Sequence, residues 1–159
     1  MKKREKELFK SLCSFKEKEF DESLLDAATP AVLGHLFFNR MQAVAFGTLE
    51  KHGLLGNVNR EFRNSLKGAA IQNIEKNNSF FQCVQLVDDA LDECKCKFAM
   101  LKGAYLCKAY PVGYRTSNDI DLLVHPDDVT EIGNELLKSG FKQGNIRNGN
   151  FEPATRKEI

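Results

Sequence analysis

Apolar residues in the first part of the chain recur at intervals of three and four, the period of an amphipathic helix. The first residues to follow this spacing are Leu24, Leu25, Ala28, Val32 and Leu36. Pro30 is expected to begin a helix there, with Thr29 as its N-cap. A further helix is expected over 40–51, ending near Gly53. The pattern therefore predicts a helical region over residues 1–95.

The most regular apolar stripe runs from about residue 57 to residue 94. Its members are Val58, Phe62, Leu66, Ala70, Ile74, Phe81, Val84, Val87, Leu91 and Cys94. One helix over the whole stretch would be unusually long for a globular protein. The polar run Asn77-Asn78-Ser79 could supply a break and a cap. We therefore expect two helices, or one kinked helix, and interpret the stripe as plain core.

From Lys97 onward the pattern alternates between the period of a strand and that of a helix. The expected elements are a strand over 98–101, a short helix over 104–109, a strand over 119–124, a helix from Pro126 to Gly140, and a strand starting within 141–144. Asn148-Gly149 is a strong hairpin-turn signal, with a second arm near Phe151. This order predicts an α+β fold, with residues 96–159 forming a core that continues the helical region in one domain.

Composition excludes several classes of protein. At 159 residues, the chain has the length of one domain, or of one domain with an appended helical region. With 23 basic and 22 acidic residues the net charge is +1, which does not suggest general nucleic-acid binding. No apolar run is long enough for a membrane span, and the N-terminus lacks the form of a signal peptide.

The cysteines suggest a reducing compartment. Five are scattered along the chain without an export signal, so reduced thiols in the cytoplasm are expected. Cys94-Lys95-Cys96 lacks a second ligand pair at the spacing of a zinc finger, and Cys94 fits the apolar stripe. No metal is therefore expected at this pair.

The strongest chemical signal is the acid pair Asp119 and Asp121. Residues two apart on a strand point to the same face, so the two carboxylates would emerge together while Ile120 enters the core. Paired carboxylates suit a hard cation such as Mg²⁺. The apolar run 122–124 suggests a strand covered on both faces, where uncompensated acids would be costly. The alternative is two exposed acids on the edge of an antiparallel strand.

A phosphate-binding turn is expected just upstream of the acids. The segment 100–106 reads as a strand, a turn at Lys102-Gly103 and a helix, which is a common geometry for holding phosphate. Gly103 could instead be an ordinary turn glycine. Arg115 could bind a triphosphate or only neutralise the carboxylates. Ser117, in the same loop, is a further nucleotide-binding candidate, or it only positions the loop.

Together these motifs resemble a known family. Residues 98–124 resemble the uncharacterised nucleotidyltransferase family of bacteria and archaea, within the DNA polymerase β-like nucleotidyltransferase superfamily. The shared motifs are Leu101-Lys102-Gly103, Tyr110-Pro111, Arg115 and the run from Asp119 to Val124.

The resemblance implies a small mixed-sheet nucleotidyltransferase core with the helical N-terminal region packed on it. It implies that Asp119 and Asp121 bind two Mg²⁺ ions and an NTP, whose phosphates lie at Gly103. The implied reaction moves an NMP group to an acceptor hydroxyl on a protein, an RNA end or a small molecule.

Two departures qualify the resemblance. Ala104 follows Gly103, so the hydroxyl that the wider superfamily offers at this turn is missing. The superfamily also takes a third carboxylate from a later strand. Here Glu152 is the one candidate on such a strand, since Glu158 is terminal. The resemblance thus leaves three expectations: Glu152 as third ligand, a core truncated at its C-terminus, or a catalytically inactive fold that serves as a binding or regulatory module.

Overall fold

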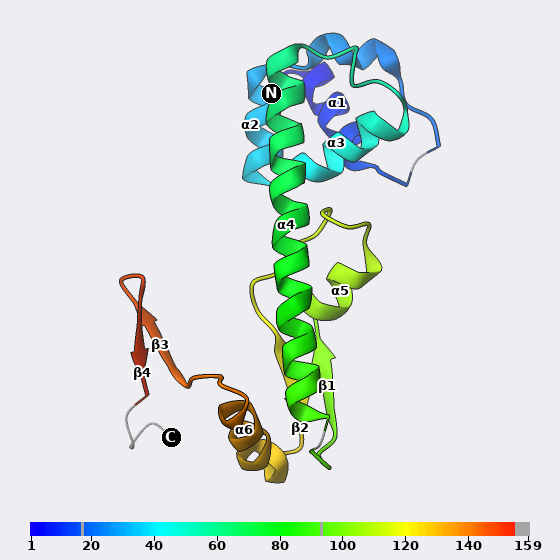
Figure 1. The fold of residues 1–159 in the computed structure, drawn as a ribbon. Helices are drawn as coiled ribbons and strands as arrows, with labels where there is room; N and C mark the ends of the chain where they lie inside the picture. Colours follow the sequence, from blue (N-terminus) through cyan, green and yellow to red (C-terminus); the bar gives the residue numbers. More distant parts are fainter. Residues whose placement is uncertain (17, 93, 155–159) are drawn as a thin grey trace. The chain divides into compact units, whose positions relative to one another are not determined.

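The computed structural model describes residues 1–16, 18–92 and 94–154 (Figure 1). Its elements are α1 (Lys3–Cys13), η1 (Glu22–Ala27), α2 (Pro30–Phe38), α3 (Gln42–Lys51), α4 (Arg60–Leu91), β1 (Phe98–Leu101), α5 (Gly103–Ala109), β2 (Asp121–Val124), η2 (Pro126–Asp128), α6 (Val129–Lys138), β3 (Gly144–Arg147) and β4 (Asn150–Pro153). They form two compact units. The first comprises Met1–Phe80 with Leu106–Asn118, and the second comprises Phe81–Tyr105 with the described residues from Asp119 onward.

The core of the first unit is built from matching pairs of apolar residues on its helices. The pairs are Leu8 and Leu12 of α1, Val32 and Leu36 of α2, Ala45 and Leu49 of α3, and Phe62 and Leu66 of α4. Residues four apart lie on one face of a helix, so each pair presents a short apolar stripe to the others. The helical spacing in the sequence is therefore the direct cause of this core.

The start of α2 is held by Thr29, as the sequence predicts. Its side-chain oxygen accepts a hydrogen bond from the Val32 N–H at 3.4 Å, and Pro30 occupies the first helical position. The Thr29 hydroxyl also donates to Glu5 Oε1 on α1 at 2.8 Å. The next helix, expected over 40–51, begins at Gln42, because Arg40 adopts the left-handed conformation with φ of 56° and separates α2 from α3.

The prediction of a break at Asn77-Asn78-Ser79 is wrong, since α4 runs without interruption from Arg60 to Leu91. Asn77 is fully buried within the helix and does not cap a new one. The cap lies earlier, at Asn59, whose Oδ1 accepts from the Phe62 N–H at 2.8 Å. Residues 60–80 of α4 belong to the first unit and residues 81–91 to the second.

The second unit holds an antiparallel pair, β1 and β2, in the register Phe98 with Val124 and Leu101 with Asp121. Ile120, Leu122 and Val124 alternate into an apolar cluster around Val87, Leu91 and Ile132. The expectation of a strand covered on both faces is wrong, because Leu123, on the opposite face, is 60% exposed. In the described part of the chain this sheet has two strands and a single covered face.

The signal for a hairpin is confirmed. β3 and β4 pair antiparallel as a separate two-stranded sheet, and Asn148 and Gly149 in the turn have φ of 50° and 80°. Positive φ at both central residues is the mark of a hairpin turn that matches strand twist. The α+β class is therefore confirmed, although both described sheets are antiparallel where a mixed sheet was expected. None of the described helices is both long and apolar enough to span a bilayer.

Candidate functional site

The acid pair lies at the start of β2. The strand begins at Asp121, so Asp119 precedes it and does not belong to it as the sequence suggested. Ile120 packs into the apolar cluster, as predicted, and Asp121 follows with its side chain 40% exposed. Both carboxylates therefore stand near the surface at the end of a pair of strands, where solvent and a ligand can reach them.

Asp121 is joined by Lys102, which directly follows β1. The Lys102 ammonium lies 3.4 Å from Asp121 Oδ2. The strand register explains the contact, because Leu101 is paired with Asp121. The structure thus brings two of the predicted site residues together from separate parts of the sequence.

The backbone of the turn differs in detail from the expectation. Lys102 adopts the left-handed conformation with φ of 43°, and Gly103 is the buried first residue of α5. A side chain in this region costs roughly 1–2 kcal/mol relative to glycine. Lys102, which lies beside Asp121, therefore carries the backbone strain. Strained backbone conformations are common at functional positions.

The loop that carries Arg115 and Ser117 belongs to the first unit. Asn73 Nδ2 on α4 donates to the Gly113 carbonyl at 3.0 Å. Gly113 has φ of 83°, and a β-carbon there would lie 2.8 Å from Ile74 Cγ1. Position 113 therefore requires glycine for two reasons: the backbone has a positive φ, and there is no room for a β-carbon.

Aromatic packing fixes the same loop. The ring of Phe15 lies 5.4 Å from that of Tyr114, edge to face, and 5.9 Å from that of Tyr110. The Tyr114 hydroxyl lies against Gly47 of α3, where a β-carbon would overlap it. Arg115 is exposed on this anchored loop. Burial raises the pKa of the Cys107 thiol, and the charge of Arg115 partly opposes that rise.

Glu152 lies on β4, in a sheet separate from the one that contains Asp121. Its carboxylate forms an ion pair with Arg147 Nε at 3.5 Å in the same hairpin. Its role as third ligand stays a prediction, as do the nucleotide-binding roles of Gly103, Arg115 and Ser117. Glu158 lies outside the described residues.

One cluster was missed by the sequence argument. Cys94, Cys96 and Glu131 place their ligand atoms within 4.8 Å of one another. The sequence predicts no metal at the two cysteines, because it has no second ligand pair at the spacing of a zinc finger. Glu131 lies on α6, far along the chain, so no local spacing could have revealed it.

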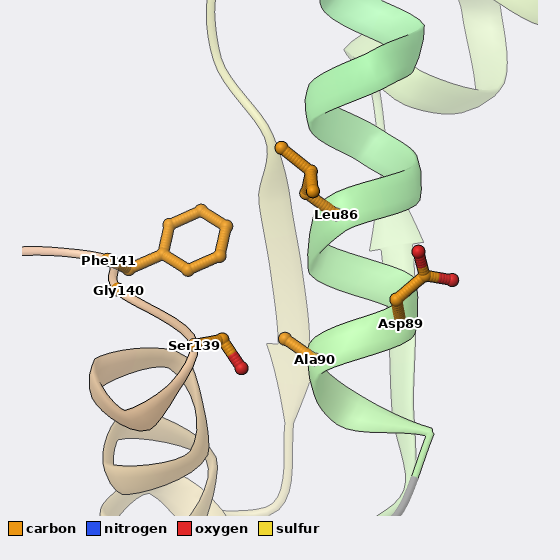
Figure 2. Close-up of a pocket in the computed structure, with 6 residues that line it drawn as sticks. All are labelled: Leu86, Asp89, Ala90, Ser139, Gly140 and Phe141. Carbon is orange, nitrogen blue, oxygen red and sulfur yellow. The ribbon is translucent and has the colours of Figure 1, made fainter.

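The second unit also has a surface hollow, lined by Leu86, Asp89, Ala90, Ser139, Gly140 and Phe141. Figure 2 shows the Phe141 ring turned toward Leu86, with Asp89 pointing away from it. None of the predicted site residues lines this hollow, and its walls carry no cation. It therefore does not resemble a triphosphate site.

Comparison with known proteins confirms the class that the site indicates. The family model described as uncharacterised nucleotidyltransferase matches residues 29–158, which include every candidate site residue above. The chain belongs to this family, and nucleotidyl transfer is its general activity. No curated protein and no solved structure matches the chain.

Proposed function

We propose that the protein transfers an NMP group from an NTP to an acceptor hydroxyl with the help of Mg²⁺. The observation that supports this most directly is the ion pair between Lys102 and Asp121. In this pair an ammonium, a group that often binds phosphate, lies beside a carboxylate, a group that often binds metal ions, at the end of the β1–β2 pair.

The residues at this position fit a magnesium ion. Asp119 and Asp121 offer carboxylate oxygens, the donors that Mg²⁺ prefers. The ammonium of Lys102 beside Asp121 indicates that the location suits positive charge. We propose Asp119 and Asp121 as the ligands of two ions, with Glu152 as a third carboxylate. Bound Mg²⁺ would neutralise charge on the transferred phosphoryl group.

The chain's own cations would orient the substrate. Lys102 supplies an ammonium for the phosphates at the turn that follows β1. Gly103 brings amide N–H groups to the same turn, which offers no hydroxyl because Ala104 follows. Arg115 and Ser117, on the anchored loop of the first unit, are proposed as further nucleotide-binding residues. Positioning and charge supply most of the catalysis in phosphoryl transfer.

A second candidate function has its own support. Glu152 is paired with Arg147 in a separate hairpin, so the third carboxylate has a partner other than a metal. A fold that binds NTP and Mg²⁺ but lacks the third ligand would serve as a binding or regulatory module. The candidate acceptors are a protein, an RNA end or a small molecule, and the proposed compartment is the cytoplasm, which suits five free cysteines.

Pyrophosphate release separates the two candidates. The purified chain is incubated with Mg²⁺ and, in turn, ATP, GTP, CTP and UTP, beside an Asp119→Asn, Asp121→Asn double variant. We expect release by the wild type and at least about a 100-fold loss in the variant. Asp127→Asn, an exposed acid in η2, is the matched control and should keep full activity.

The result would be read together with NTP binding. Binding that requires Asp119 and Asp121, without pyrophosphate release, would favour the regulatory module. Equal NTP binding and equal release by wild type and double variant would reject the assigned site. Where release is found, a mass increase equal to one NMP minus one water on a protein, an oligonucleotide or a small alcohol would identify the acceptor class.

A further inference from the structure

The connection between α4 and β1 carries two thiols on one face. Cys94, Cys96 and Phe98 are half-buried, whereas Lys95 and Lys97 are exposed, as expected of alternating positions in an extended segment. Both cysteines pack against the apolar cluster of the second unit. Cys94 and Cys96 therefore point to the same side, toward α6.

Glu131 completes a group of three donors. It lies in the first turn of α6, and its carboxylate oxygen and the two Sγ atoms all lie within 4.8 Å of one another. Tetrahedral zinc binds sulfur at about 2.3 Å and carboxylate oxygen at about 2.0–2.2 Å, which puts the donors about 3.5–3.8 Å apart. Small side-chain rotations would bring the three atoms to that spacing.

A backbone hydrogen bond orients the thiol of Cys94. The Cys96 N–H donates to Cys94 Sγ at 3.4 Å. A hydrogen bond from an amide to a ligand sulfur favours the thiolate and fixes its direction.

The chemistry of the cluster also suits a cation. Two sulfur atoms and a carboxylate oxygen lie within 4.8 Å of one another. A divalent ion would offset the mutual repulsion of their negative charges by binding both thiolates and the carboxylate at once.

The position explains what such an ion would do. The apolar cluster of the second unit has only three buried members among the described residues, Val87, Leu91 and Ile132. A core this small provides little stability by itself. An ion held by Cys94, Cys96 and Glu131 would link the end of α4 to the start of α6 around that cluster.

We propose that Cys94, Cys96 and Glu131 form a zinc site that stabilises the second unit, with water or Asp128 in the fourth position. Two thiolates select a soft or borderline ion such as Zn²⁺ over Mg²⁺. The site is distinct from Asp119 and Asp121, whose oxygen donors suit the harder ion. We assign the site a structural role because it lies beside the apolar cluster of the second unit.

The test uses the full chain, reduced with a phosphine, treated with a chelator and desalted. Zn²⁺ is titrated against a chromogenic competitor, and Co²⁺ is added to a second sample as an optical probe. We expect one tightly bound Zn²⁺ per chain and a thiolate-to-cobalt charge-transfer band in the near ultraviolet. Saturating Zn²⁺ should raise Tm by at least about 4 °C.

The variants assign the site. Cys94→Ser with Cys96→Ser should abolish the charge-transfer band and the Tm shift, and Glu131→Gln, which leaves both thiols in place, should weaken Zn²⁺ binding at least about tenfold. Cys83→Ser, an exposed cysteine of α4, is the matched control and should change nothing. Alkylation provides a readout that does not depend on stability: Zn²⁺ should protect Cys94 and Cys96 while Cys83 still reacts.

Three results would overturn the proposal. The first is absence of stoichiometric Zn²⁺ uptake by the reduced wild type. The second is uptake that survives loss of both cysteines but disappears in the Asp119→Asn, Asp121→Asn variant. The third is a Cys94–Cys96 disulfide that re-forms in the presence of Zn²⁺.

Discussion

The Lys102 ammonium lies 3.4 Å from the Asp121 carboxylate, and both groups are well exposed, at 74% and 40%. An ion pair at this exposure contributes at most about 1 kcal/mol to folding. The left-handed backbone at Lys102 costs a similar amount, so the arrangement brings no clear gain in stability. Stability therefore does not explain this position, which supports the proposed role of Lys102 in phosphate binding.

Replacement of Lys102 by glycine should therefore separate stability from function. Lys102→Gly relieves the backbone strain but also removes the ion pair with Asp121, so the free energy of unfolding should change by less than about 1 kcal/mol. Loss of the ammonium should weaken NTP binding by about tenfold or more. Urea unfolding and calorimetric titration with the NTP that binds best would measure the two effects.

Asn148 provides the control for this experiment, because it also has a positive φ, 50°, in the β3–β4 turn. Asn148→Gly should also change the free energy of unfolding by less than about 1 kcal/mol and leave NTP affinity unaltered. Unchanged NTP affinity in Lys102→Gly would show that the lysine is only a turn residue.

Gly47 should be intolerant of even one added carbon. A β-carbon at this buried position overlaps the Tyr114 hydroxyl, so Gly47→Ala must displace the ring or shift α3. Overpacking of this kind costs about 1–3 kcal/mol. Urea unfolding should show the loss, and adding Tyr114→Phe, which removes the nearest oxygen, should recover part of it.

Gly68 of α4 provides the comparison, since nothing lies within 4 Å of a β-carbon built there. Gly68→Ala should stabilise the protein by about 0.5–1 kcal/mol through helix propensity. If Gly47→Ala proved as stable as the wild type, the loop that carries Arg115 would not be anchored on α3 as described.

Glu5 should contribute to the loss of stability in acid. The hydrogen bond from the Lys2 N–H, followed by that from the Thr29 hydroxyl, lowers the pKa of Glu5 below its ordinary 4.5. A lowered folded-state pKa means that the contribution is complete above the unfolded value and is lost as pH falls through the folded value. The sensitive window therefore lies below 4.5.

Unfolding of Glu5→Gln measured from neutral pH to about pH 3 should show lower stability at neutral pH and a shallower acid slope than the wild type. Glu7→Gln, an exposed glutamate of the same helix, should keep the wild-type slope. Parallel acid profiles for wild type and Glu5→Gln would contradict the described hydrogen bonds.

Asn77 should be replaceable by an apolar residue without loss. Its side chain is fully buried, and among the described residues neither Oδ1 nor Nδ2 has a hydrogen-bond partner. An unpaired buried amide costs roughly 1–3 kcal/mol, so Asn77→Leu should leave the free energy of unfolding unchanged or raise it by about 1 kcal/mol. A clear loss in thermal or urea unfolding would reveal a partner for the amide.

Local patterns allowed the helices and strands to be predicted from the sequence where neighbouring residues determine them. Thr29 caps α2, β1 and β2 stand where apolar runs predicted strands, and Asn148-Gly149 turns the hairpin. The prediction failed at Asn77. Asparagine is common where helices break, but here the apolar stripe continues with helical spacing on both sides of Asn77, and the side chain is buried within one continuous helix. Propensity is a weak guide wherever tertiary burial decides.

In the candidate site, too, the residues in one short segment could be predicted from the sequence, whereas contacts between distant segments could not. The acids and the turn at Lys102 follow from a short segment, so the sequence indicated them. The contact between Asp121 and Lys102 depends on strand register, which local spacing does not specify. The closeness of Glu131 to Cys94 and Cys96 depends on the path of the chain between β1 and α6. Without Glu131, the two cysteines resemble ordinary core residues.

The helix α1 lies wholly upstream of Thr29, where the match to the family begins. Yet it supplies Leu8 and Leu12 to the core of the first unit, and its Glu5 accepts a hydrogen bond from the Thr29 hydroxyl. A protein shortened to the family's own limits would expose the apolar stripes of α2 and α3 to water and would leave the cap of α2 half-satisfied. Protein produced for activity assays should therefore include α1. Without it, a loss of activity could result from a destabilised fold and would say nothing about the catalytic residues.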